Sequence, residues 1–234
     1  MDWTILCDLA PRCAAAQMAR DAAAARQAKP LARIFTWQPA AVSWGWKQAL
    51  PEWLQALRAE PPRDLELTER PTGGGIAWHG SDVSVSVVVP RALAGLAASL
   101  DAACRSAVRL CERYGASALV QAGLPARGQP VAYCLAEPSE YAVLIGGRKV
   151  AGFAARRYPE AWLVQGSLLV QPLPTPIRSA VPDAVLARTE QAAAPLAAAS
   201  ISAVQPGDAA RRWAAHWAAW WTASMEELAL AHAV

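Results

Sequence analysis

The chain has 234 residues, of which 54% are hydrophobic and 18% charged, with a net charge of +3. This composition is typical of a globular protein, and the weak positive charge forms no basic patch that would indicate nucleic acid as a partner. No stretch is long and apolar enough to predict a membrane span. Five cysteines without metal-ligand spacing predict reduced thiols in a cytoplasmic protein with no metal site.

Hydrophobic periodicity divides the first part of the chain into helices and strands. The predicted elements are, in chain order, a helix over Cys13–Ala28, a strand over Arg33–Trp37, a helix over Pro51–Ala59, and strands over Leu65–Glu69, Ile76–His79 and Val83–Val89. The last two strands are expected to pair as a hairpin. In the second of them valine alternates with serine, so one face of the strand is apolar and the other polar.

The longest apolar stripe predicts a helix over Ala92–Tyr114, which Gly115 ends. The elements expected after it are a strand over Ala118–Gln121, a loop over Gly123–Pro130, and strands over Tyr141–Ile145, Lys149–Arg156 and Leu163–Val170. Gly146-Gly147 is typical of a two-residue hairpin turn. Central strands flanked by helices predict an α+β fold with a mixed, largely antiparallel sheet.

The composition changes after residue 171. Residues 172–234 begin with a proline- and alanine-rich connection and end in a predicted helix over Ala209–Ala231. Four tryptophans recur along this helix at the spacing of one face, namely Trp213, Trp217, Trp220 and Trp221. We interpret residues 1–171 as the core of the domain and expect the tryptophan-rich helix to pack on that same domain rather than to form a binding surface.

Three features are candidates for chemistry. The loop from Arg70 to Gly75, with three consecutive glycines, is either a tight turn or a backbone cradle for an oxyanion, phosphate or carbonyl. Lys149 either extends to solvent or points inward to contact such a group. Cys134 could act as a nucleophile, whereas Cys104 and Cys111 lie on a helical stripe and are expected to be structural.

Several stretches, in this order, resemble the motifs of the lipoate–protein ligase A family: Gln17–Asp21, Arg33–Gln48, Arg70–His79, Gly147–Ala154 and Gln165–Leu169. The resemblance implies the catalytic-domain fold that this family shares with biotin–protein ligases. It also implies that the glycine loop and Lys149 hold an acyl carbonyl or acyl phosphate. The substrate-binding residues that it implies are Arg70, Thr72, Gly73, Gly74, Gly75, His79, Gly152, Ala154, Gln165 and Gly166.

The run from Cys134 to Tyr141 is similar to the one that carries the nucleophile in cysteine-type octanoyltransferases, with Lys149 following 15 positions after the cysteine. This resemblance implies that Cys134 and Lys149 are catalytic. The implied reaction moves octanoyl or lipoyl from an acyl carrier protein to a lysine of a lipoyl domain or H protein, through a Cys134 thioester and without a cofactor.

Two alternatives remain open from the sequence. Gly73-Gly74-Gly75 resembles ligases rather than the Gly-Gly-Arg of many transferases, and an ATP-dependent lipoate–protein ligase would use ATP and Mg to form lipoyl-AMP. Gln165 replaces a histidine of the family, which leaves a catalytically inactive acyl-binding or partner subunit as a third reading.

Overall fold

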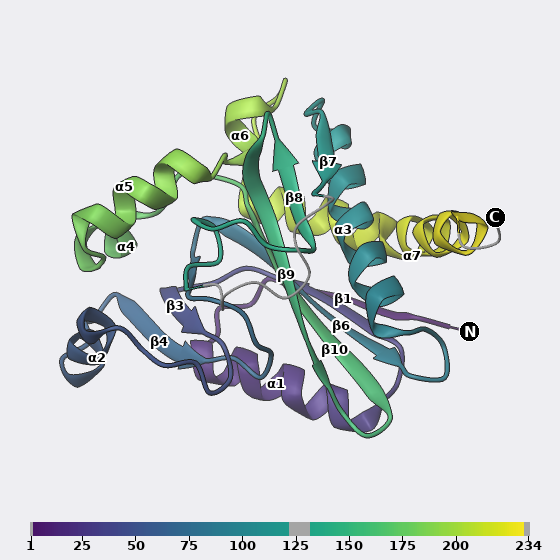
Figure 1. The fold of residues 1–234 in the computed structure, drawn as a ribbon, viewed down its shortest axis with the longest axis horizontal. Helices are drawn as coiled ribbons and strands as arrows, with labels where there is room; N and C mark the ends of the chain where they lie inside the picture. The colour runs from purple at the N-terminus through teal and green to yellow at the C-terminus, as the bar shows by residue number, and fades with distance from the viewer. Residues whose placement is uncertain (1, 122–131, 232–234) are drawn as a thin grey trace.

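The computed structural model describes residues 2–121 and 132–231, and the loop expected over Gly123–Pro130 lies outside them. Within the described residues the chain forms a seven-stranded sheet of order β1-β2-β6-β10-β9-β8-β7 (Figure 1). Its strands are β1 Thr4–Asp8, β2 Leu31–Phe35, β6 Asp82–Pro90, β7 Ala118–Val120, β8 Ala142–Ile145, β9 Arg148–Arg157 and β10 Ala161–Leu169. Neighbouring strands are antiparallel except β1 and β2. The predicted α+β fold with a largely antiparallel sheet is confirmed.

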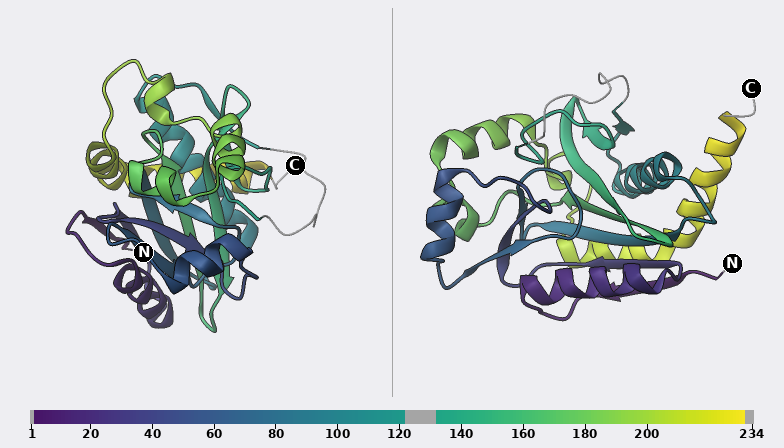
Figure 2. Two further views of the ribbon diagram at one scale, coloured as in Figure 1. Left: turned by 90° about the vertical axis from the view of Figure 1, so that its left-hand side faces the viewer. Right: turned by 60° about the horizontal axis from the view of Figure 1, so that its bottom comes forward.

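Helices cover both faces of this sheet (Figure 2). α1 (Ala14–Gln27) lies on one face, and α3 (Leu96–Arg113) and α7 (Pro206–Ala231) pack together on the other. The alternation in β6 explains this division, because Val83, Val85, Val87 and Val89 all belong to the core beneath α3 and α7. The serines between them face the side of α1, where polar side chains gather.

A second sheet with the order β4-β3-β5 lies at one end of the large one. It contains β3 (Ala40–Trp44), β4 (Leu65–Glu69) and β5 (Ala77–His79). The short helices α2 (Glu52–Ala59), α4 (Thr175–Ala180) and α5 (Asp183–Ala192) surround it, and they share its hydrophobic core through Leu54, Ile177 and Leu186. The remaining helix, α6, covers Leu196–Ala199.

The predicted hairpin of Ile76–His79 with Val83–Val89 is wrong. β5 pairs with β3 in the small sheet, whereas β6 lies in the large sheet between β2 and β10. The chain turns sharply between the two strands at Gly80, whose φ of +122° suits glycine. Asp82 fixes this turn by accepting the Gly80 N–H at 3.0 Å.

Other local predictions differ from the structure mainly in their boundaries. α3 begins at Leu96 instead of Ala92, because β6 runs to Pro90 and Gly95 is the residue that precedes the helix. The Gly146-Gly147 turn joins β8 to β9 as expected, with both glycines at positive φ. Strands β1 and β3 and helices α4 to α6 were not among the predicted elements.

The tryptophan stripe of α7 faces inward. Trp213 and Trp217 are fully buried, and Trp220 and Trp221 nearly so, in the core that α7 shares with α3. Trp213 also donates to Ser106 of α3. The stripe therefore stabilises the large sheet from its apolar side. None of the described helices combines the length and apolar character needed to span a membrane.

Candidate active site

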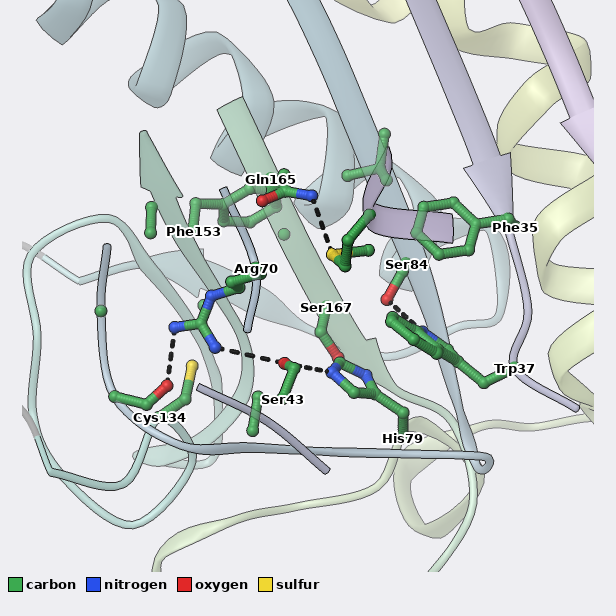
Figure 3. Close-up of a pocket in the computed structure, with 18 of the residues that line it drawn as sticks. Phe35, Trp37, Ser43, Arg70, His79, Ser84, Cys134, Phe153, Gln165 and Ser167 are labelled. Carbon is green, nitrogen blue, oxygen red and sulfur yellow. Dashed lines mark hydrogen bonds between the residues drawn. The ribbon is translucent and has the colours of Figure 1, made fainter. Parts of the chain in front are cut away.

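A cavity lies between the two sheets, beside the glycine loop (Figure 3). Its empty volume is about 610 Å³, including space open to solvent. Its lining combines apolar side chains with a few polar ones. The lining residues are Met18, Phe35, Trp37, Ser43, Arg70, Gly74, Gly75, Ala77, His79, Ser84, Val85, Cys134, Ser139, Gly152, Phe153, Ala154, Gln165, Gly166 and Ser167.

Most of the residues expected at the site line this cavity. They are Cys134, Arg70, Gly74, Gly75, His79, Gly152, Ala154, Gln165 and Gly166. Thr72, Gly73 and Lys149 do not line it. Thr72 is buried and donates to Gln165, and Lys149 is buried behind Ser139, which does reach the cavity.

Arg70 holds the glycine loop in shape. Its guanidinium donates to the carbonyls of Gly73, at 2.8 and 3.1 Å, and of Gly75, at 2.6 Å, and to the Ser43 hydroxyl at 3.2 Å. Burial lowers the pKa of Arg70, although the guanidinium keeps its charge at neutral pH. Arg70 forms no ion pair with any described residue, including the nearby acids Glu69 and Asp82, and Asp82 contacts His79 instead.

The backbone at Gly74 requires glycine. Its φ is +86°, and a Cβ there would lie 2.9 Å from Nη2 of Arg70. The loop is also closely packed from outside, since a Cβ on Gly45 would meet the carbonyl oxygen of Gly74 at 2.2 Å. Gly73 differs, because a Cβ added there would meet no atom of the described residues within 4 Å. The loop therefore has no space for a side chain at Gly74, whereas it has space for one at Gly73.

Cys134 is fixed to the end of the glycine loop by backbone pairing. Its N–H donates to the Ile76 carbonyl, and the Ile76 N–H donates to Ala132, both at 2.8 Å. A Cβ on Gly152 of β9 would lie 3.0 Å from Sγ of Cys134 and 3.3 Å from Nζ of Lys149. The absence of a side chain at Gly152 therefore lets the thiol and the ammonium approach the same region.

Two buried cations flank this thiol without a carboxylate partner. Lys149 is 4% exposed and donates to the Ser139 hydroxyl and the Glu137 carbonyl, at 2.5 and 3.2 Å. Arg70 donates only to carbonyls and a hydroxyl. Among the described residues no carboxylate lies within ion-pair distance of either cation. Because a buried charge without a counter-ion is costly, this arrangement favours the binding of a negatively charged group, such as the oxyanion of a substrate, beside them.

The other candidate thiols are structural. Burial raises the pKa of Cys104 well above its ordinary value and that of Cys111 to about 12. Both belong to the hydrophobic core beneath α3. A thiol held neutral in an apolar core is a poor nucleophile, as expected for these two residues.

His79 lies between Ser43 and Asp82 at the base of the cavity. Nε2 of His79 is 2.8 Å from the Ser43 hydroxyl, and Nδ1 is 2.9 Å from Oδ2 of Asp82. The indole of Trp37 stacks on the imidazole, with ring centroids 4.0 Å apart. Burial opposes ionisation of Asp82, yet His79 and the donors Ser167 and Gly80 lower its pKa overall.

Gln165 connects the glycine loop to α1. Its Oε1 accepts from Thr72 at 2.7 Å, and its Nε2 donates to Asp21 at 2.6 Å. Asp21 in turn forms a buried ion pair with Arg33 of β2, also at 2.6 Å. An amide can accept on one side and donate on the other without changing its charge, so Gln165 completes this network as a neutral link.

Sequence reasoning missed several residues of the cavity. Ser43 and Trp37 lie inside a stretch that resembles a family motif, and that signal could have marked them. Asp82 lies three positions after His79, and its role depends on the Gly80 turn, for which the sequence carried no separate signal. Phe153 fills the space that Gly166 leaves empty, since a Cβ on Gly166 would meet its ring at 2.3 Å.

Comparison with protein families agrees with this arrangement. The lipoyl protein ligase A/B catalytic domain matches residues 13–208. The chain belongs to this family. It is thus an enzyme of the lipoate ligase and transferase family, as the motifs in its sequence implied. A comparison with curated proteins finds no match.

Solved structures share the fold at low identity. A T. acidophilum protein with bound lipoic acid has a TM-score of 0.67 and 18% identity, covering 97% of this chain and 86% of its own. A lipoate-protein ligase A bound with ATP has a TM-score of 0.65 and 18% identity, with coverages of 92% and 83%. A bi-partite T. acidophilum lipoate protein ligase, studied with its E2 lipoyl domain, has a TM-score of 0.62 and 18% identity, with coverages of 97% and 84%.

Proposed function

We propose that this enzyme transfers octanoyl or lipoyl from an acyl carrier protein to a lysine of a lipoyl domain or H protein, through a thioester on Cys134. The observation that carries the proposal is the thiol at the cavity, flanked by two buried cations without carboxylate partners. Met18, Phe35 and Trp37 supply apolar surface for the acyl chain. The related T. acidophilum structure with lipoic acid supports such an acyl ligand.

In the first half of the reaction the Cys134 thiolate attacks the carbonyl carbon of the donor thioester. The carbonyl oxygen becomes an oxyanion, which Arg70 and Lys149 stabilise by charge. The carbon–sulfur bond to the carrier breaks, and the carrier leaves as a thiolate that takes a proton from solvent. In the second half the acceptor amine attacks the Cys134 thioester, which yields the amide and regenerates the thiol. A lipoyl domain as acceptor is supported by the related bi-partite ligase.

Intact mass spectrometry tests the proposal. The protein is incubated with octanoyl carrier protein and, separately, with octanoate plus ATP and Mg. We expect a covalent octanoyl adduct in the first mixture, its loss in Cys134→Ala, and its retention in Cys13→Ser, where an exposed cysteine is replaced. An adduct that survives in Cys134→Ala would disprove the role of Cys134.

ATP-dependent ligation is the second candidate. Gly73-Gly74-Gly75 is the loop sequence of ligases, and one related structure binds ATP. In that reaction the glycine loop and the two cations would hold an acyl phosphate instead of an acyl thioester. Transfer to a lipoyl domain from octanoate plus ATP, without any Cys134 adduct, would favour it. Binding of octanoate without transfer in either mixture would instead favour an inactive acyl-binding subunit, the reading suggested by Gln165.

A further inference from the structure

A chain of hydrogen bonds runs along the floor of the cavity from Asp82 to Arg70. Asp82 contacts Nδ1 of His79, Nε2 of His79 contacts the Ser43 hydroxyl, and Arg70 donates to that same hydroxyl. Figure 3 shows Ser43 between the guanidinium and the imidazole. The residues come from β3, β5, β6 and the glycine loop, so the fold rather than a local motif brings them together.

The direction of each proton in this chain follows from the chemistry of the groups. A guanidinium can only donate, so Ser43 accepts from Arg70 and its own O–H is free to donate to Nε2 of His79. In the uncharged ring the Asp82 carboxylate favours the tautomer with the proton on Nδ1, which leaves Nε2 as an acceptor. In that tautomer the lone pair of Nε2 points at the Ser43 hydroxyl, and His79 has the geometry of a base.

The surroundings fix this arrangement. Oδ2 of Asp82 also accepts from Ser84 at 2.9 Å and from Ser167 at 2.6 Å, so the carboxylate cannot rotate away. Trp37 stacks on the imidazole and donates to Ser84 at 2.8 Å. Base, orienting carboxylate and hydroxyl have the hydrogen-bond order of a Ser-His-Asp triad, and Ser43 and His79 line the same cavity as Cys134.

We propose that Ser43, His79 and Asp82 form the proton relay that deprotonates the acceptor amine in the second half of the reaction. This inference rests on the proposed function. The first half of the proposed reaction involves the sulfur of Cys134 and no amine. A lysine amine, in contrast, carries an excess proton at neutral pH and must lose protons to form an amide.

The step balances as follows. The lysine ammonium first gives one proton to solvent, and the uncharged amine nitrogen then forms a bond to the thioester carbonyl carbon. Its proton passes to Oγ of Ser43 while the Ser43 proton passes to Nε2 of His79, and Asp82 stabilises the imidazolium. The carbon–sulfur bond to Cys134 then breaks, and the positive charges of Arg70 and Lys149 stabilise the thiolate that leaves. The imidazolium returns its proton to solvent.

A single-turnover experiment tests the relay. Wild type, Ser43→Ala and His79→Gln are first acylated with octanoyl carrier protein, and decay of the Cys134 adduct is then followed by mass after addition of a lipoyl domain. In a parallel arm the adduct is treated with hydroxylamine, which is uncharged at neutral pH and needs no base. We expect acylation and hydroxylamine decay to stay within a few-fold of wild type, and lysine transfer to fall about 10²–10⁴-fold.

Each other outcome overturns the relay. Equal losses in both decay reactions would mean that Ser43 and His79 only hold Arg70 in place. Undiminished lysine transfer would mean that the amine loses its proton to another group. An octanoyl adduct on Ser43 in Cys134→Ala would make Ser43 a nucleophile instead. If His79→Gln does not fold, the comparison of Ser43→Ala with wild type still tests the relay. Failure of wild type to form any adduct would refute the proposed function itself, before the variants are compared.

Discussion

Cys134 and Lys149 approach a single point in the structure, the position that a side chain on Gly152 would occupy. That position is 3.0 Å from Sγ of Cys134 and 3.3 Å from Nζ of Lys149. The two residues come from different segments, and neither hydrogen bonds to the other. Gly152 therefore controls how closely thiol and ammonium can approach a common substrate atom.

Substitution of Gly152 by alanine should impair acylation and leave the fold intact. The new methyl group must displace the ends of both side chains, and displacements of about 1 Å cost on the order of 10²-fold in rate. We expect at least a tenfold slower formation of the Cys134 adduct, measured by rapid-quench mass spectrometry. Gly207→Ala is the matched control, because its Cβ would meet only Arg211, at 3.8 Å. Equal rates for Gly152→Ala and wild type would contradict this role.

Gly73 and Gly74 should respond differently to alanine. Gly74→Ala places a Cβ at positive φ and 2.9 Å from Arg70, which should cost about 1–3 kcal/mol of unfolding free energy together with most activity. Gly73→Ala meets no described atom within 4 Å and should leave stability within about 1 kcal/mol of wild type. Denaturant unfolding of both variants measures the difference. Similar losses of stability in the two would refute the distinction.

Removing the charge of Asp82 should destabilise the protein in a pH-dependent manner. Because folding lowers the pKa of Asp82, its contribution is present above the unfolded-state value, about 3.9, and is lost as pH falls through the lower folded-state pKa. At pH 7 we expect Asp82→Asn to cost about 1–3 kcal/mol, because His79, Ser84 and Ser167 lose their charged acceptor. The difference in unfolding free energy between variant and wild type should become smaller below about pH 4. A difference in unfolding free energy that does not change with pH would argue against an ionised Asp82.

The apolar lining should make the enzyme selective for acyl chain length. Octanoyl has four methylenes more than butyryl, and at about 0.8 kcal/mol each their burial is worth at most about 3 kcal/mol before ordering costs. We expect the octanoyl donor to have a specificity constant kcat/KM at least tenfold higher, in assays with the two acyl carrier proteins. Equal constants would show that the tail remains outside the cavity.

Local sequence signals predicted those parts of the fold that depend on neighbouring residues. The valine–serine alternation gave β6 its two faces, and Gly146-Gly147 gave the turn between β8 and β9, since both features act within a few residues. The pairing of β5 could not be read in this way. His79 and Ser43 are 36 positions apart, and their contact depends on β3, which has no strong pattern of its own.

Part of the candidate site could also be predicted from local sequence signals. Motif resemblance marked Cys134, Arg70 and His79, because their residue types recur at fixed spacing. It could not indicate that Arg70 is buried without a carboxylate, or that Lys149 lies behind the cavity wall instead of in it. Burial and charge balance result from the packing of the two sheets, and no single segment encodes them.

The cavity occupies the seam between those sheets, with Ser43 and His79 on the small one and Gly152, Gln165 and Ser167 on the large one. An acyl group bound between the sheets contacts both of them and therefore extends the hydrophobic core that they share. Without it, the small sheet can open locally at less cost than global unfolding. Acylation should thus make the two sheets exchange amide hydrogens as one cooperative unit, with the gain in protection concentrated in β3 and β5.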